Sequence, residues 1–252
     1  MKAFSHFSTL FKGLCCLLLI SSVASADLAF NLDSARFSPN APAATINDFI
    51  TQNPNSGVDP GGTFFNLTNT SGNFVPVEQL TIPGGLDVGG GYFVEYSFGP
   101  GEADGRVSST AGPDAHNDLN PITESFSNNA TGTINITGLL ANSAAGDTIT
   151  LTIYGIGDNI GQETTFEVDY AGTLATGSTL FNAPGEPRDS DVGSIPFVDF
   201  SFVSDGVTDS ISFDATEGGI LNGFSVGITA IPEPSSAILL AGFGLLGLRR
   251  RK

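Results

Sequence analysis

Apolar and polar residues alternate with a period of two in many short segments of the chain. In one of them, Ile149, Leu151 and Ile153 alternate with threonines. This alternation is typical of a β-strand with one face buried and the other in solvent. The same habit predicts further strands at 28–32, 62–67, 74–82, 91–98, 133–137, 164–170, 197–203, 209–213 and 223–229.

A sustained apolar stripe with a period of 3.6 residues is missing from the region between the two ends of the chain. The nearest approach, residues 44–52, is brief and ends at Asn53-Pro54. Many short strands joined by turn-rich links predict an all-β fold, an antiparallel β-sandwich or jelly roll. Two long polar connections rich in Gly and Pro, 99–120 and 183–193, are where we expect any binding site.

The N-terminus has the three parts of a secretion signal. Lys2 and Lys12 precede an apolar run at 14–20, and Ala24 and Ala26 have the spacing that signal peptidase reads. We therefore predict a signal helix over residues 1–26, export by a translocase, and cleavage before Asp27. Both cysteines of the chain lie in this segment, so the mature protein would contain no disulfide and no Cys-based metal site.

The C-terminus predicts a short hydrophobic helix that is not a comfortable membrane span. Residues 237–248 are apolar and are followed by four cations at 249–252. As a helix, this stretch would rise only about 18 Å, against a hydrocarbon core of about 30 Å. The terminal cations favour the cytoplasmic side, so the pattern suits a tail held in the inner membrane for a time while the rest is exported.

Pro232, Glu233 and Pro234, followed by this apolar segment and basic cluster, resemble the PEP-CTERM sorting signal of Gram-negative bacteria. The same tail is also called the ice-binding protein C-terminal domain, a label that carries no expectation about ice. The resemblance covers 231–252 and implies recognition by exosortase, a membrane protease-transpeptidase. It further implies delivery to the cell envelope, the outer surface or an extracellular polysaccharide matrix, and it leaves the activity of the remaining chain open.

The region between the two signals, 27–230, is predicted to be one acidic domain. Of the 26 carboxylates in the chain all but Glu233 lie here, and the only basic residues beside them, histidine apart, are Arg36, Arg106 and Arg188. Such a charge repels nucleic acid phosphates and anionic lipid, which excludes nucleic acid as a partner.

Motifs for catalysis find little support in this domain. Ser225 lies in a G-x-S-x-G pattern, but the hydrolase elbow needs a following helix and a later histidine, so we interpret Ser225 as one residue of the last strand. His116 is the only histidine outside the signal segment, which leaves no second member for a triad or a multi-histidine metal site.

Carboxylates in Gly-rich turns make calcium the cofactor that the sequence favours most. Asp189 and Asp191 form one D-x-D pattern, and Asp158 precedes Asn159 in another turn. Ca²⁺ collects carboxylate and amide oxygens in such turns, although the spacing is not that of an EF-hand. We state calcium at these places as a hypothesis, with a solvated turn as the alternative.

A second set of segments resembles the strands of carbohydrate-binding-like jelly rolls: Gly138-Leu139-Leu140, 146–159, Asp209-Ser210-Ile211 and Leu221-Asn222-Gly223-Phe224. The resemblance implies polysaccharide as a partner. We therefore expect a non-enzymatic envelope or matrix protein whose β-sandwich is structural or binds glycans. A secreted carboxylate-dependent hydrolase of the glycosidase kind and a self-associating adhesin remain open as alternatives.

Overall fold

The computed structural model describes the chain in nine segments, which include every strand and helix named below. They are residues 27–33, 45–68, 84–98, 104–105, 127–128, 132–155, 163–180, 196–217 and 221–231. The predicted signal segment, the predicted strand at 74–82 and the C-terminal tail beyond Ile231 lie outside these residues. None of the helices in the described part is long and apolar enough to cross a membrane.

Two sheets make up the domain, which confirms the predicted all-β sandwich. The first sheet has the strand order β11-β8-β13-β1-β2 and the second has the order β10-β9-β12-β7-β4-β3. The first sheet contains β1 (Leu28–Asp33), β2 (Thr63–Thr68), β8 (Thr148–Tyr154), β11 (Phe197–Val203) and β13 (Gly223–Thr229). The second contains β3 (Leu86–Gly89), β4 (Tyr92–Phe98), β7 (Gly132–Thr137), β9 (Glu163–Tyr170), β10 (Thr173–Leu180) and β12 (Ser210–Glu217), and β5 (Asp104–Gly105) pairs with β6 (Ser127–Asn128).

All pairings in the two sheets are antiparallel except one. Strands β1 and β2 run parallel, with Leu28 opposite Thr63 and Leu32 opposite Leu67. A parallel pair needs a crossover connection, and here the chain crosses through the helix α2 (Ile46–Gln52). The brief helical pattern at 44–52 is thus a real helix, and it lies in the crossover of the one pair that departs from the expected antiparallel arrangement.

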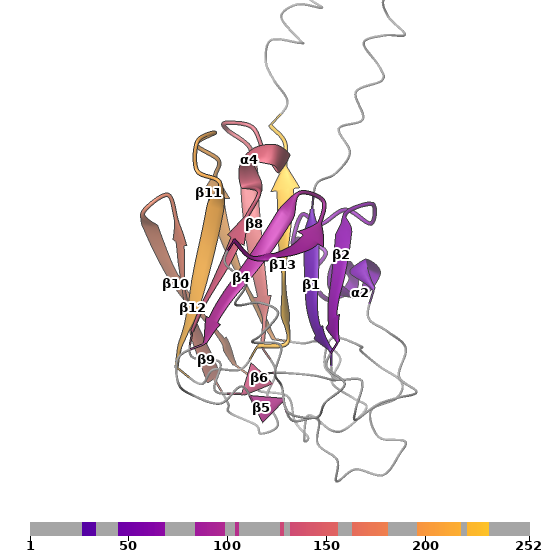
Figure 1. Ribbon diagram of the computed structural model, residues 1–252, viewed down its shortest axis with the longest axis vertical. Helices are drawn as coiled ribbons and strands as arrows, with labels where there is room; N and C mark the ends of the chain where they lie inside the picture. The colour runs from indigo at the N-terminus through magenta and orange to yellow at the C-terminus, as the bar shows by residue number, and fades with distance from the viewer. Residues whose placement is uncertain are drawn as a thin grey trace, which may run out of the picture.

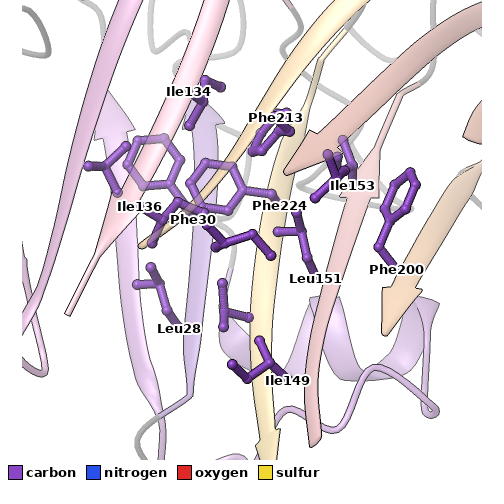
Figure 2. Close-up of a cluster of buried hydrophobic side chains, with 14 of the residues drawn as sticks. Leu28, Phe30, Ile134, Ile136, Ile149, Leu151, Ile153, Phe200, Phe213 and Phe224 are labelled. Atoms are coloured by element: carbon purple, nitrogen blue, oxygen red, sulfur yellow. The ribbon is translucent and has the colours of Figure 1, made fainter. Parts of the chain in front are cut away.

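The core lies between the inner faces of the two sheets (Figure 2). Phe30 of β1 and Phe224 of β13 stack with ring centroids 4.8 Å apart, and Phe213 from the second sheet meets Phe224 edge-on at 5.5 Å. The alternating residues Ile149, Leu151 and Ile153 are all fully buried here. These positions are the apolar half of the predicted alternation, so hydrophobic burial orients each strand.

Strand β1 begins and β13 ends at the same end of the sandwich, which we call the terminal end (Figure 1). Leu28 pairs with Val226, and Thr229 at the end of β13 pairs with Thr148 at the start of β8. The hairpins β3–β4 and β9–β10, the short helix α4 (Leu139–Asn142) and the β11–β12 connection also lie at this end. The connections β8–β9, β10–β11 and β12–β13 join strand ends at the opposite end.

Candidate functional site

The site residues predicted from the sequence lie outside the described residues. These are the calcium candidates Asp158, Asp189 and Asp191, the sorting motif Pro232, Glu233 and Pro234, and the cleavage-site residues Ala24 and Ala26. The calcium hypothesis stays a prediction. Within the described segments, no group of three or more His, Cys, Asp or Glu residues is arranged to hold a metal ion.

Strand pairing does relate the two chain segments that contain the calcium candidates. Segment 156–162 follows the end of β8, and segment 181–195 leads into the start of β11. Tyr154 and Phe197, at those two strand ends, are direct register partners. Two places that are far apart in the sequence therefore connect to neighbouring strand ends of the first sheet.

Ser225 lies within β13 and is fully buried, which confirms its interpretation as a strand residue. Gly223, Ser225 and Gly227 lie on the outer face of the first sheet, where α2 and the chain that follows it pack closely against the strand. A Cβ at Gly227 would stand 2.3 Å from the Ser56 carbonyl oxygen. The G-x-S-x-G pattern thus permits a close backbone approach and is not a nucleophile elbow.

A smaller apolar cluster holds α2 on this outer face. It consists of Ala29, Ile46, Phe49, Val58 and Tyr154. The Tyr154 ring meets Phe49 edge-on, with centroids 5.1 Å apart. Helix α2 begins after Thr45, whose N–H and hydroxyl both donate to the Asp48 carboxylate, and it ends at Gln52, with Asn53 as its C-cap.

The C-terminal end of α2 is tied to a carboxylate on the edge strand β11. The Asn53 side-chain amide donates to Asp199 Oδ1 at 2.8 Å, and the Thr152 hydroxyl donates to the same oxygen at 2.6 Å. Asn53 and Thr152 are both buried, while Asp199 is exposed. Two fixed donors therefore hold the Asp199 carboxylate in one orientation at the surface.

An aromatic ring lies beside this carboxylate on the same face of β11. Phe197 is 37% exposed, and its ring centroid is 6.1 Å from that of the buried Tyr154. Burial raises the pKa of Tyr154, and the nearby Asp199 charge raises it further. Tyr154 therefore stays neutral and supports the Phe197 ring from below.

We call Phe197, Asp199 and Ser201 the β11 platform. All three are on the outer face of the edge strand, and Ser201 is exposed next to Thr150. Among the described residues, Asp199 Oδ2 has no hydrogen-bond donor, so this oxygen can accept from a ligand. An apolar ring surface next to an oriented acceptor can bind a molecule that has both an apolar face and hydroxyl groups.

Sequence reasoning missed this platform because it has the form of an ordinary strand. In F-V-D-F-S-F-V, the alternation alone assigns Asp199 to a solvent-facing position. The contact with Asn53 joins residues separated by 146 positions, and no local pattern predicts it. A carboxylate between two phenylalanines on an edge strand was the one signal available.

The outer face of the second sheet is polar and carries several carboxylates. Asp214 of β12 lies directly opposite Glu167 of β9, and Asp169 is opposite Ser212. Like charges opposite each other on neighbouring strands are destabilising. Among the described residues of this face, Phe93 of β4 is exposed, and none of the hydrogen bonds orients a carboxylate beside it as Asn53 and Thr152 orient Asp199.

Comparison with known families confirms the sorting signal. Residues 230–252 match the PEP-CTERM protein-sorting motif, one residue longer than the predicted tail. The motif implies export and association with the cell envelope or surface in Gram-negative bacteria, with processing by exosortase. A comparison with curated protein sequences gives no significant match.

Two solved structures resemble the domain weakly. The CBM35 domain from Cellvibrio japonicus Abf62 has 17% identity and a TM-score of 0.26, over 43% of this chain and 78% of that chain. A β-glucosidase from Kluyveromyces marxianus in complex with glucose has 12% identity and a TM-score of 0.25, over 82% of this chain and 25% of that chain.

Proposed function

We propose that the domain is a non-catalytic glycan-binding module of an envelope or extracellular-matrix protein, and that the β11 platform binds the sugar. The observation that carries the proposal is the pair of Phe197 and Asp199. Sugar rings have apolar faces and hydroxyl-bearing edges. An exposed aromatic ring beside a carboxylate held by two buried donors fits both of these features.

The negative charge of the domain limits which glycans it can bind. The described residues contain many carboxylates and no Lys, Arg or His, and the whole chain has a formal net charge of −17. Such a surface repels sulfated or uronic-acid polymers. We therefore propose a neutral polysaccharide of the matrix as the partner, reached after a temporary stay of the tail in the inner membrane.

The test is binding of the exported protein to neutral exopolysaccharide from its own host, measured by affinity electrophoresis. Phe197→Ala removes the ring, and Asp199→Asn keeps an acceptor for Asn53 and Thr152 while changing the group offered to the ligand. Each substitution should weaken binding about tenfold, which corresponds to about 1.4 kcal/mol. Leu174→Ala is the matched control, because Leu174 is 61% exposed on the second sheet.

The same protein preparation distinguishes glycan binding at the β11 platform from the hydrolase and the adhesin alternatives. Equal retardation of the wild type and both platform variants would refute binding at β11. Release of reducing ends from the polysaccharide would instead identify a hydrolase, the catalytic alternative. Growth of particle size with protein concentration in light scattering, with no retardation by polysaccharide, would identify a self-associating adhesin.

A further inference from the structure

Strand β10 (Thr173–Leu180) forms one edge of the second sheet, and among the described residues it pairs only with β9. Figure 1 shows it at one side of the sandwich. Its eight residues stay in continuous register with β9, without a bulge, and they include neither a charged residue nor a proline. Edge strands of natural proteins are usually protected against further pairing by charges, prolines, bulges or short length. The β10 edge has none of these protections.

The other three edges of the two sheets differ from β10. Strand β3 has only four residues, and its register with β4 shifts between Asp87 and Gly89. Strand β11 has the charge of Asp199 near its centre. Strand β2 has six residues, and its side chains at 63–66 are all half-buried. Among the edges of the described sheets, β10 is therefore the longest one that is uncharged and open to a further strand.

The backbone of β10 has a row of hydrogen-bonding groups that face away from β9. Ala171 and Gly172, which join the two strands, both have a positive φ, as in a type I′ turn. Such a turn makes Tyr170 and Thr173 a hydrogen-bonded pair, so the odd-numbered residues of β10 bond to β9. The even-numbered residues therefore direct their N–H and C=O groups out from the edge. These residues are Leu174, Thr176, Ser178 and Leu180.

The side chains of these four residues lie on the outer face, and their order is symmetric about Gly177. Leu174 is 61% exposed and Leu180 is 44% exposed, and Thr176 and Ser178 are exposed between them. If a second β10 runs antiparallel about a two-fold axis at Gly177, Leu174 of each copy lies opposite Leu180 of the other. The same register places even-numbered residues opposite even-numbered residues, as the hydrogen-bonded pairs of an antiparallel ladder require.

We infer that two copies of the domain form a symmetric dimer by antiparallel pairing of β10 with β10, in the register centred on Gly177. The second sheets of the two copies then become one continuous sheet, and the exposed leucines of each copy pack against those of the other. The self-complementary order of β10 favours a second copy over a strand of another protein. The inference does not rest on the proposed function, because the β11 platform lies on the outer face of the first sheet. Leu174→Ala remains the control for glycan binding at concentrations where the protein is a monomer.

The charge of the chain favours β10 as the place where two copies meet. With a formal net charge of −17, two copies repel each other. Glu163, Glu167 and Asp169 of β9 are the carboxylates directly opposite β10 residues. In the dimer, the two β9 strands would be three strand spacings apart, about 14 Å, which exceeds the Debye length of about 8 Å at physiological ionic strength. Pairing through β10 therefore keeps these two rows of carboxylates apart.

The first experiment is sedimentation equilibrium of the exported protein over a range of concentrations. One strand pair is a small contact, so we expect a weak monomer–dimer equilibrium, with the dimer populated below about 1 mM protein. A wild type that remains monomeric up to this concentration would overturn the inference. Growth beyond the dimer would overturn it as well, because pairing about a two-fold axis occupies the β10 edge of both copies.

Thr176→Pro tests whether the β10 edge makes the contact. Proline removes an N–H that points away from β9, so the ladder with β9 keeps its bonds while the symmetric dimer loses two. We expect the dissociation constant of the dimer to rise about tenfold or more. Thr176→Val keeps the N–H and is the matched control. A Thr176→Pro protein that is folded by circular dichroism and dimerises as well as Thr176→Val would contradict pairing through β10.

Cysteine cross-linking tests the register and does not depend on the proline variant. Directly opposite residues of a hydrogen-bonded pair have Cα atoms about 5.5 Å apart, within the range of a disulfide, whereas diagonal neighbours are about 7–8 Å apart. Under mild oxidation, a mixture of Thr176→Cys and Ser178→Cys proteins should therefore form disulfide dimers about tenfold faster than either protein alone. The wild type gives the background, since both native cysteines lie in the predicted signal segment. Equal rates in the mixture and in the separate proteins would overturn the inference.

Discussion

Asp27 and Ile228 are hydrogen-bonded to each other across 201 positions of sequence, with the Ile228 N–H donating to Asp27 Oδ1 at 2.8 Å. The other oxygen, Oδ2, accepts from the Asp59 N–H at 2.7 Å. Asp27 is 1% exposed. One carboxylate therefore joins the start of β1, the end of β13 and the connection that leads to β2.

Removing this carboxylate should destabilise the domain strongly. Asp27→Ala leaves the Ile228 and Asp59 N–H groups without their charged acceptor in a part-buried site, and we expect the free energy of unfolding to fall by about 2–4 kcal/mol. Asp27→Asn keeps one acceptor oxygen and should lose less. Urea unfolding of the processed proteins measures the difference. Equal stability of wild type and Asp27→Ala would contradict the buried-acceptor role.

A side chain at position 227 should also destabilise the domain strongly. Its missing Cβ makes room for the Ser56 carbonyl and for Gly57, whose backbone carbon would be 2.7 Å from the new methyl group. Gly227→Ala should lower the free energy of unfolding by about 1–3 kcal/mol, because backbone must move on both sides. Gly61→Ala is the control, since its new methyl group would meet only the Asp59 side chain. A smaller loss at Gly227 than at Gly61 would refute this account of the G-x-S-x-G pattern.

The predicted strands agree with the structure where the alternating apolar residues are the buried ones. A strand is missed where its inward-facing residues are small. Strand β10 was not predicted, because its inward positions include Gly177 and Thr179. A Cβ on Gly177 would stand 2.7 Å from Val198, so the approach of β10 to β11 requires a small residue there. The small residue at Gly177 weakens the apolar alternation of β10, and it is required by the side chain of Val198 on β11. The sequence of β10 alone does not contain that information.

The candidate site was less accessible to prediction than the fold. The sequence directs attention to polar connections, whereas the β11 platform is made of strand residues. Asp199 becomes distinctive only through Asn53 and Thr152, which are brought to it by α2 and by strand pairing. Alternation predicts which face a residue occupies. It does not predict which distant side chain will orient that residue.

Repulsion between Glu167 and Asp214 on the second sheet predicts a substitution that stabilises the domain. Glu167→Lys places a cation directly opposite Asp214, so the free energy of unfolding should rise by about 0.5–1 kcal/mol at low salt. Added salt should reduce this gain by screening. Glu167→Gln removes the repulsion without adding attraction and should give a smaller gain. A salt-independent gain in Glu167→Lys would indicate packing as the cause, contrary to this explanation.

Asp205 predicts an acid-dependent contribution to stability. The Thr208 hydroxyl donates to its carboxylate at 2.7 Å, the Val207 and Thr208 N–H groups donate as well, and together they lower the pKa of Asp205 to about 2. Because the folded-state pKa lies below the ordinary value of 3.8, this stabilisation is present above about pH 4 and is lost as the pH falls toward 2.

The corresponding measurement compares the wild type with Asp205→Asn in urea at about pH 5 and about pH 2. The wild type should be the more stable protein at pH 5, and the difference should shrink toward zero at pH 2. A difference that is constant over this range would mean that the carboxylate charge does not stabilise the β11–β12 connection.

The central position of β1 and β13 has a consequence for export itself. These neighbours come from opposite ends of the domain, so the first strand to cross the membrane must wait for the last before the sheet can close. A threaded chain therefore cannot complete this sheet partway through transport. The first sheet is therefore complete only once the chain up to Thr229 is available.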